Sequence, residues 1–168
     1  MFFFLTELNQ IFEEGFRHTF FKVPEKVPAE FKPPGVHIGA IPSVGNSTEE
    51  KEDWPFIVNR IVDGEDKIDG ARFTVNTTCG VWNGDTVEAG ENEILNMINR
   101  CRALILQNET IAKKYRLEHP IKWHMGSVSD PYIQAFPFFS GVIASKWEGP
   151  TYEHNLTTKE QKEIYGYL

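Results

Sequence analysis

The segment WPFIVNRIVDGEDKIDGARFTVNTTCGVW, residues 54–82, decides the fold of this chain. Residues 56–62 are rich in β-branched side chains, and residues 71–82 alternate apolar and polar side chains as a half-buried strand does. Between them, DGEDKIDG places Asp63, Glu65, Asp66 and Asp69 among glycines. This pattern predicts two antiparallel strands joined by a long hairpin loop with a solvated acidic tip.

Two amphipathic helices are expected on either side of this hairpin. Apolar residues recur every three or four positions over residues 4–16 and again over residues 88–115. Asp85 and Glu88, three residues apart, resemble a capping box at the start of the second helix. This helix should lie across the apolar face of the sheet.

The complete pattern predicts an α+β fold, with a mixed or mainly antiparallel sheet packed against helices in the order α-β-β-β-α-β-β. The remaining strands are expected at residues 36–41, 121–125 and 136–147. Residues 1–150 form one domain in this prediction, and the four prolines of residues 22–34 indicate an extended arm within residues 20–53. Residues 42–53 are expected to form a flexible loop. Residues 151–168 should form a tail or docking segment, with room for a short helix at residues 158–165.

Composition indicates a globular protein whose charge does not favour nucleic acid. Of the 168 residues, 40% are hydrophobic and 24% are charged, as in an ordinary folded domain. The net charge of −7 repels DNA phosphates and anionic membranes. The start MFFFL has no basic leader and is too short for a signal sequence, so no secretion and no membrane span are expected.

No motif of the sequence predicts catalysis, a cofactor or a metal. GxSxG, GxGxxG, GxxxxGK[ST] and HExxH patterns do not occur. The acidic residues 63–69 lack the spacing of an EF-hand, so a solvated hairpin tip is preferred to a calcium site. Cys79 and Cys101 cannot form a zinc site by themselves, and buried reduced thiols are preferred to a disulfide. His124 is interpreted as a surface or hydrogen-bonded residue.

Two further clusters have a structural and a functional interpretation. Lys113, Lys114 and Arg116 are placed at the end of the second helix, where cations offset the helix dipole, and this is preferred to a nucleic-acid contact. In QAFPFFSG, Phe138 and Phe139 must point to opposite faces of a strand. At least one of them therefore lies either under a second layer or at a subunit contact.

Four segments of the chain resemble a known family in order and spacing. They are PFIVNRIVDGEDKIDGARFTVNTTCGVW, GENEILNMINRCRALILQN, HPIKWHMGS and PYIQAFPFFSGVIASKWEGP. They resemble small proteins encoded in the head-to-tail region of long-tailed phages, of the tail terminator or tail completion type. The resemblance covers residues 54–150 and includes the final Trp147 and Glu148. The proline-rich arm is longer than in the compact pattern of the family.

The resemblance implies a structural virion protein, made in the host cytoplasm, that is not an enzyme. Such a protein assembles as a homo-oligomeric ring, commonly of six subunits, which caps the tail tube and joins it to the head. Its partners would be further copies of itself, the tail tube protein and a head-tail connector or neck protein. Genomic DNA would pass through the channel without specific binding, and a negative lining would help its passage. Asp63, Glu65, Asp66 and Asp69 are candidates for a lumen or subunit-contact loop.

Two alternatives remain. A head-completion or neck adaptor would bind the portal with long arms, and the proline-rich arm favours it. A small enzyme would need a convergent polar pocket, for which the sequence gives no sign. The first alternative differs from the terminator in its partner, because an adaptor should stay with DNA-filled heads and a terminator should cap isolated tails.

Overall fold

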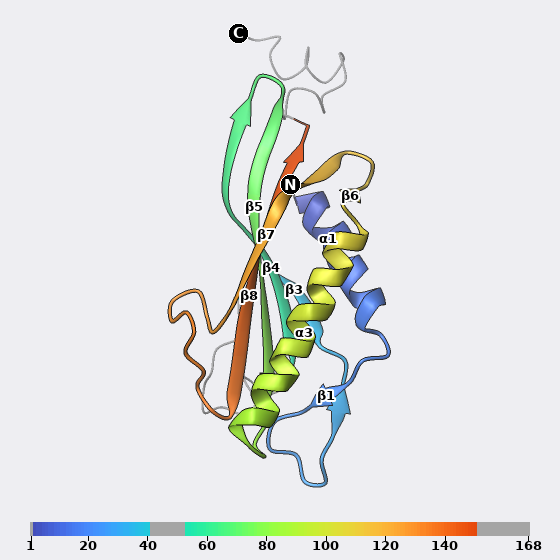
Figure 1. Ribbon diagram of the computed structural model, residues 1–168. Coiled ribbons are helices and arrows are strands. Elements are labelled where there is room, and N and C mark those ends of the chain that lie inside the picture. The colour runs from blue at the N-terminus through green and yellow to red at the C-terminus, as the bar shows by residue number, and fades with distance from the viewer. Residues whose placement is uncertain (1, 41–52, 151–168) are drawn as a thin grey trace.

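The computed structural model describes residues 2–40 and 53–150, which form two helices and a sheet (Figure 1). The elements are, in order, α1 (Phe2–Phe16), β1 (Phe21–Lys22), β2 (Phe31–Lys32), β3 (Gly35–Ile38), β4 (Phe56–Lys67), β5 (Gly70–Trp82), α3 (Val87–Gln107), β6 (Thr110–Ile111), β7 (Tyr115–Met125) and β8 (Phe138–Gly149). The order expected from the sequence is present, with the two-residue strands β1, β2 and β6 added to it.

The main sheet has six strands in the order β3-β4-β5-β8-β7-β6. β3 runs parallel to β4, and every other neighbouring pair is antiparallel. β1 and β2 pair separately as a two-stranded ribbon. The α+β class with a mixed, mainly antiparallel sheet is therefore confirmed, as is the antiparallel hairpin of β4 and β5.

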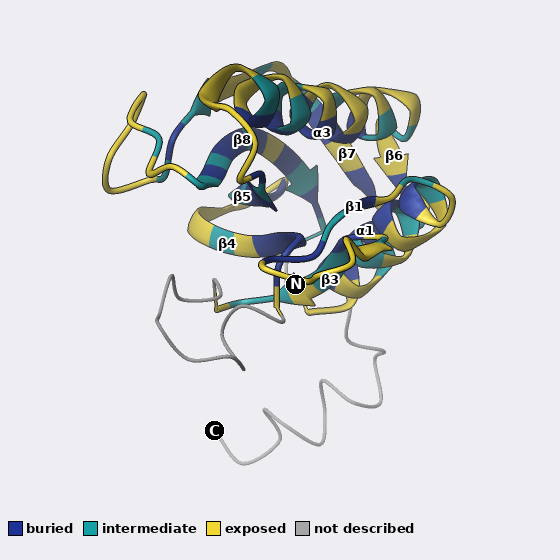
Figure 2. Ribbon diagram, turned by 90° about the horizontal axis from the view of Figure 1, so that it is seen from below, coloured by how far each residue is buried: buried dark blue, intermediate teal, exposed yellow. Residues whose placement is uncertain are grey.

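Both helices cover the same face of the sheet. α3 lies against β5 and β8, and α1 lies beside it against β3 and β4 (Figures 1 and 2). The period-two pattern of β5 supplies the centre of the core, since Phe73, Val75 and Cys79 are buried on the covered face. Phe4 from α1 joins them and lies 4.9 Å from the ring of Trp147, between ring centroids.

α3 approaches the sheet so closely that glycine is required on both sides of the contact. A Cβ atom at Gly90 would lie 2.1 Å from the ring of Phe139, and one at Gly141 would lie 2.2 Å from Ile98 Cδ1. Both distances are far below van der Waals contact. The two glycines therefore set the depth at which α3 rests on β8.

The start of α3 differs from the expected capping box. Thr86 is the N-cap residue, and its Oγ1 accepts a hydrogen bond of 3.0 Å from the Ala89 amide. Asp85 instead pairs with Lys22 of β1. The expected cap residue thus contacts a distant segment, and the neighbouring Thr86 caps the helix in its place.

The end of α3 is also earlier than the expected Tyr115. The helix ends at Gln107, where Asn108 Nδ2 donates to the Leu104 carbonyl at 2.8 Å. The chain then reverses in a tight turn, with positive φ angles of 51° at Ala112 and 56° at Lys113. Tight turns of this kind usually contain an Asn-Gly or Asp-Gly pair in the sequence. Neither pair occurs here, and the apolar Ile111 fits the helical spacing, so the predicted helix was too long.

The expected extended arm is partly a hairpin. Phe21 pairs with Lys32 and Lys22 with Phe31, and the side chains of Phe21, Val23 and Pro24 are buried. Only residues 25–30 and Phe31 are exposed among residues 21–32. The segment is therefore exposed at residues 25–31, whereas at its base apolar side chains pack on the domain.

Three strand boundaries also differ. β7 begins at Tyr115 and runs through Pro120, where an irregularity between Glu118 and Lys122 accommodates the missing amide hydrogen. β8 begins at Phe138 and not at position 136. β3 ends at Ile38. The expected loop at residues 42–53 lies, except for Asp53, outside the described residues, as does the tail at 151–168.

A second, smaller apolar cluster lies on the sheet face that the helices leave open. Trp54, Phe56 and Val58 are buried there, and Phe138 packs against them. The ring centroids of Trp54 and Phe138 are 5.0 Å apart. Phe139, the next residue, is fully buried in the main core. The two phenylalanines thus point to opposite faces, as expected, and both find apolar partners within the domain.

We expect Gly90→Ala to destabilise the fold, although alanine is the better helix former. The added methyl group would have to displace the Phe139 ring, and overpacking of this kind costs about 1–3 kcal/mol. Urea unfolding followed by circular dichroism measures the change. Ala substitution of the neighbouring exposed Glu91 is the control, with an expected effect within about 0.5 kcal/mol. An unchanged midpoint for Gly90→Ala would contradict the close contact.

Candidate functional site

The hairpin of β4 and β5 extends past the rest of the sheet (Figure 1). β3 pairs with β4 only over residues 56–59, so residues 60–67 of β4 have no strand on their outer side among the described residues. A free strand edge is a place where another chain can dock, and charged side chains normally protect it. This free edge is therefore the first candidate for a contact surface.

The four predicted acidic residues lie along this edge, but not in a loop. Asp63, Glu65 and Asp66 belong to β4, whose ladder with β5 continues to the pair Lys67 and Gly70. Only Asp69, with Ile68, forms the turn. The stretch DGEDKIDG was interpreted as a loop because of its glycines and acids, whereas backbone pairing with β5 keeps it extended. All four acids are exposed, as expected.

On the open face of the sheet, charged side chains form two rows that cross four strands. Cα partners in the ladders place Glu65, Arg72, Glu148 and Arg116 in one row and Asp63, Thr74, Lys146 and Glu118 in the next. The first row alternates in sign, from an anion on β4 to a cation on β7. Register, and not sequence proximity, produces this pattern, because partners in a ladder share a face.

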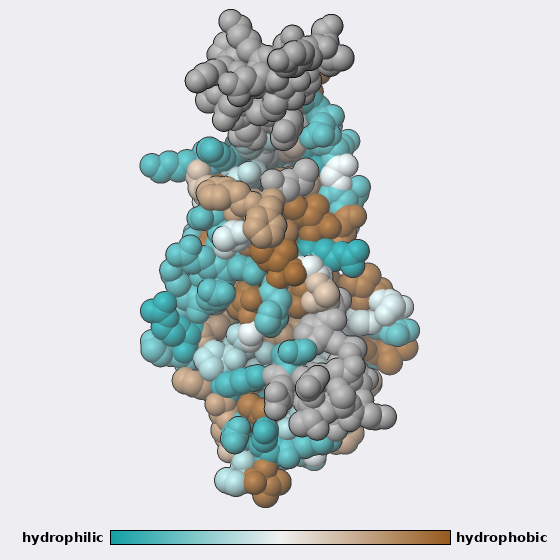
Figure 3. Space-filling view, turned by 180° about the vertical axis from the view of Figure 1, so that it is seen from behind, coloured by the Kyte–Doolittle hydropathy of each residue, from teal (hydrophilic) through white to brown (hydrophobic). Residues whose placement is uncertain are grey.

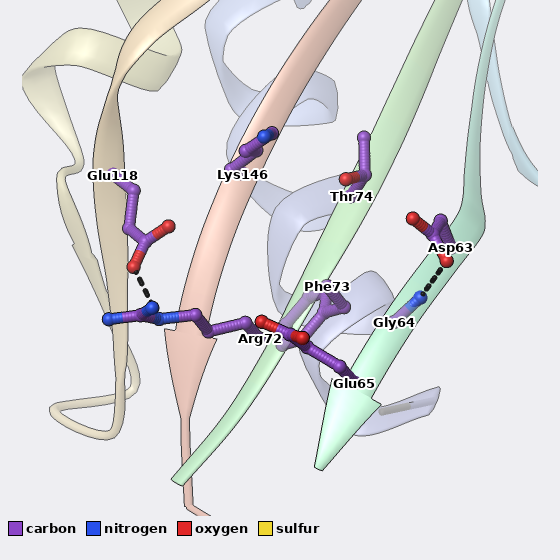
Figure 4. Close-up of a pocket in the computed structure, with 8 residues that line it drawn as sticks. All are labelled: Asp63, Gly64, Glu65, Arg72, Phe73, Thr74, Glu118 and Lys146. Carbon is purple, nitrogen blue, oxygen red and sulfur yellow. Dashed lines mark hydrogen bonds and ion pairs between the residues drawn. The ribbon is translucent and has the colours of Figure 1, made fainter. Parts of the chain in front are cut away.

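Ion pairs hold the middle of these rows together. Arg72 Nε lies 2.8 Å from Glu118 Oε1, and Arg72 Nη2 lies 4.0 Å from Glu148 Oε1. The Arg72 side chain crosses β8 to reach Glu118, while Asp63 and Glu65 lie on its other side (Figure 4). The side chains enclose an open hollow of about 280 Å³. Because these pairs are partly exposed, each contributes little stability, and their main effect is to fix side-chain positions.

Glu65 is also held by its own strand. Lys67 Nζ lies 2.8 Å from Glu65 Oε1, and this hydrogen bond and charge hold the pKa of the Glu65 carboxyl below its ordinary value. The more distant charges of Arg72 and Lys146 act in the same direction. By contrast, Asp63, Asp66 and Asp69 form no ion pair within residues 2–40 and 53–150. Of the four acids, Glu65 is thus the one that is ion-paired within these segments.

The opposite edge of the sheet carries cations. Lys113 and Lys114 lie in the turn between β6 and β7, and Arg116 follows on β7. All three are exposed and, within the described segments, none is in an ion pair. Because α3 ends at Gln107, the expected role of these cations in offsetting its dipole is wrong. They are instead an unpaired basic group in a chain of net charge −7.

Two histidines and both cysteines, which could take part in chemistry, instead make contacts within the domain. His119 Nε2 lies 2.8 Å from Glu109 Oε1, and His124 Nδ1 lies 3.0 Å from the Met125 carbonyl oxygen. Cys79 and Cys101 are free and buried, with sulfur atoms 3.7 Å apart, and burial raises the pKa of the Cys101 thiol. Within the described part of the chain, no group of three or more His, Cys, Asp or Glu could hold a metal ion.

The open face of the molecule is a mosaic of hydrophilic and hydrophobic side chains (Figure 3). No described helix is long and apolar enough to cross a membrane. No protein-family model and no curated protein matches the chain. The arrangement therefore has to be interpreted from its own geometry, which consists of two oppositely charged sheet edges and an ion-paired surface between them.

Sequence reasoning found the acids but missed the residues that accompany them. Arg72 lies on the polar face of its strand, and nothing in the sequence pairs it with Glu118 or Glu148. Lys146 was not singled out at all. The sequence SKWEG, residues 145–149, does place a cation and an anion two positions apart, on one face of a strand. This pattern identifies their partners only when the ladder with β5 is known.

Lys67→Gln should raise the pKa of Glu65 toward its ordinary value, because it removes the nearest cation and hydrogen-bond donor. Carboxyl-detected NMR titration measures this pKa directly. In the wild type the difference from an ordinary glutamate should shrink as salt is added, since both groups are exposed. Lys122→Gln, on another strand, is the matched control and should leave Glu65 unchanged. An unchanged pKa of Glu65 in Lys67→Gln would contradict the contact between these two side chains.

Proposed function

We propose that this protein is a phage tail terminator, a structural virion protein that forms a ring, caps the tail tube and joins the tail to the head. The single observation that carries the proposal is the presence of two unlike, exposed edges on one open sheet, acidic at β4 and basic at the β6–β7 turn. Unlike edges make head-to-tail contacts between identical chains, and such contacts form a ring when the rotation from one copy to the next closes. The resemblance of residues 54–150 to terminator proteins supplies the biological setting.

The proposed partners follow from this role. Further copies of the chain would form the ring, commonly of six subunits, and its two ends would meet the tail tube protein and a head-tail connector or neck protein. Genomic DNA would pass through the channel. The net charge of −7 supports passage without retention, because phosphates are repelled by an acidic lining. The proposal includes neither catalysis nor a cofactor.

A neck adaptor that binds the portal is the second candidate. The β1–β2 ribbon favours it, because Val27 at its end is 96% exposed and Phe31 is 55% exposed, although both are hydrophobic. Exposed apolar side chains on a projecting ribbon suit insertion into a partner. In an adaptor this ribbon would be the main contact, whereas in a terminator the sheet edges would be.

Electron microscopy of the purified protein should show rings with a central channel, and the protein added to tails that lack it should bind at one end of the tube. Binding to DNA-filled heads but not to tails would favour the adaptor. The variant Val27→Ser/Phe31→Ser separates the two roles further, since it should abolish head binding by an adaptor and leave tail capping by a terminator intact. A persistent monomer that binds neither structure would contradict both proposals.

Neutralising the acidic hairpin tests its assigned place in the ring. We expect Asp63→Asn, Glu65→Gln, Asp66→Asn and Asp69→Asn together to weaken ring assembly, to slow DNA passage, or to do both. Sedimentation velocity measures assembly, and the yield of infectious particles in complementation measures passage. If both stayed at wild-type levels, the hairpin would be neither a lumen nor a subunit-contact element.

A further inference from the structure

We infer that adjacent subunits meet where the acidic hairpin tip of one docks on the basic corner of the next. The hairpin tip is defined as Asp66, Ile68 and Asp69, and the basic corner as Phe2, Phe3, Lys113 and Lys114. The inference rests on the proposed ring and names the contact that would close it. It thereby assigns the hairpin to a subunit contact and not to the channel lining.

Charge is the first argument for this contact. Asp66 and Asp69 are exposed anions, and Lys113 and Lys114 are exposed cations, with no ion pairs to other described residues. Elsewhere on the sheet Arg72, Glu118 and Glu148 satisfy one another. The hairpin tip and the basic corner thus carry opposite charges outside these pairs, which is the arrangement that electrostatic complementarity between copies requires.

Apolar exposure is the second argument. Ile68 is fully exposed at the hairpin turn between the two acids, and Phe2 and Phe3 are 73% and 52% exposed in the first turn of α1. This turn adjoins the basic corner, because the Phe4 ring lies 5.1 Å from the ring of Tyr115, the residue after Lys114. Each edge therefore presents an apolar centre flanked by charges, and the flanking charges have opposite signs.

The position of the two surfaces along the strand direction is the third argument. The row from Glu65 through Arg72 and Glu148 ends at Arg116, so the acidic segment of β4 and the basic corner lie at the same end of the sheet. In a cyclic ring, successive subunits are related by rotation without translation along the axis. With strands roughly along that axis, rotation brings these two edges together.

The shape of the β7 edge argues for side-chain docking and not for strand addition. Pro120 lies in β7 at the irregularity between Glu118 and Lys122, and β6 already covers β7 at Tyr115 and Arg116. A proline and a bulge are features that prevent pairing with another strand. The contact is therefore expected to depend on charge and on Ile68, and to weaken as salt is raised.

Charge reversal provides the test. The tip variant Asp66→Lys/Asp69→Lys should not form rings, because two basic surfaces then meet, and the corner variant Lys113→Glu/Lys114→Glu should fail because two acidic surfaces meet. The four substitutions combined in one chain should restore rings. An equimolar mixture of the two double variants should also form rings, of alternating subunits and even number. Mass photometry and electron microscopy measure all four samples.

Two controls separate charge from folding and from net charge. Circular dichroism and thermal unfolding of each variant should match the wild type, since the substituted residues are exposed. The control Glu13→Lys/Glu91→Lys changes the net charge as the tip variant does, at exposed sites on α1 and α3, and should still form rings. A further variant, Ile68→Asn, keeps all charges and should raise the protein concentration needed for ring assembly at least tenfold.

The outcomes distinguish the contact from the function. The contact would be overturned if both double variants still formed rings like those of the wild type. It would also be overturned if neither the mixture nor the four-substitution chain assembled. Either result would leave the proposed terminator function standing. A wild type that stays monomeric at low salt and does not cap tails would overturn the terminator and the contact together.

Discussion

The close contact between α3 and β8 is the constraint on which the rest of the structure depends. Gly90 and Gly141 let the helix lie so near the sheet that the Phe139 ring packs directly over Gly90 and the Ile98 side chain over Gly141. At this distance the apolar stripe of α3 is buried completely, with Ile94, Met97 and Ile105 at 0% exposure.

Hydrogen bonds between polar residues inside the domain hold the other helix, α1, against the sheet. Thr77 Oγ1 donates to Asn59 Oδ1 at 2.6 Å, and Asn59 Nδ2 donates to Asn9 Oδ1 at 2.8 Å. This chain links β5, β4 and α1 beside the apolar core, where unsatisfied groups would be costly. It fixes α1 against the sheet and thereby fixes the first turn of α1 beside the β6–β7 turn. The exposed Phe2 and Phe3 are positioned by interactions far from the surface.

The surface charges have a different physical character from the core. Individual exposed ion pairs contribute little, and the pairs of Arg72 with Glu118 and Glu148 are no exception. Among the described residues, the charges outside ion pairs include Asp63 and Asp66 on β4 and Lys113 and Lys114 at the β6–β7 turn. Unpaired charges on opposite edges favour association of unlike surfaces and disfavour association of like ones.

The sequence by itself determined the α+β class, the order of the main elements, the hairpin pairing and the apolar face of β5, because the periodicity of side chains within one element is a local property. It also located the four acids and their exposure. Only the tertiary structure decided that three of these acids lie on a strand, that α3 stops at Gln107 and that the proline-rich segment forms a ribbon with a buried base. Each of these depends on a partner distant in sequence: β5 for the acids, β7 for the segment after α3, and the core for Phe21. The basic corner and the charge rows are likewise products of register, which no local pattern contains.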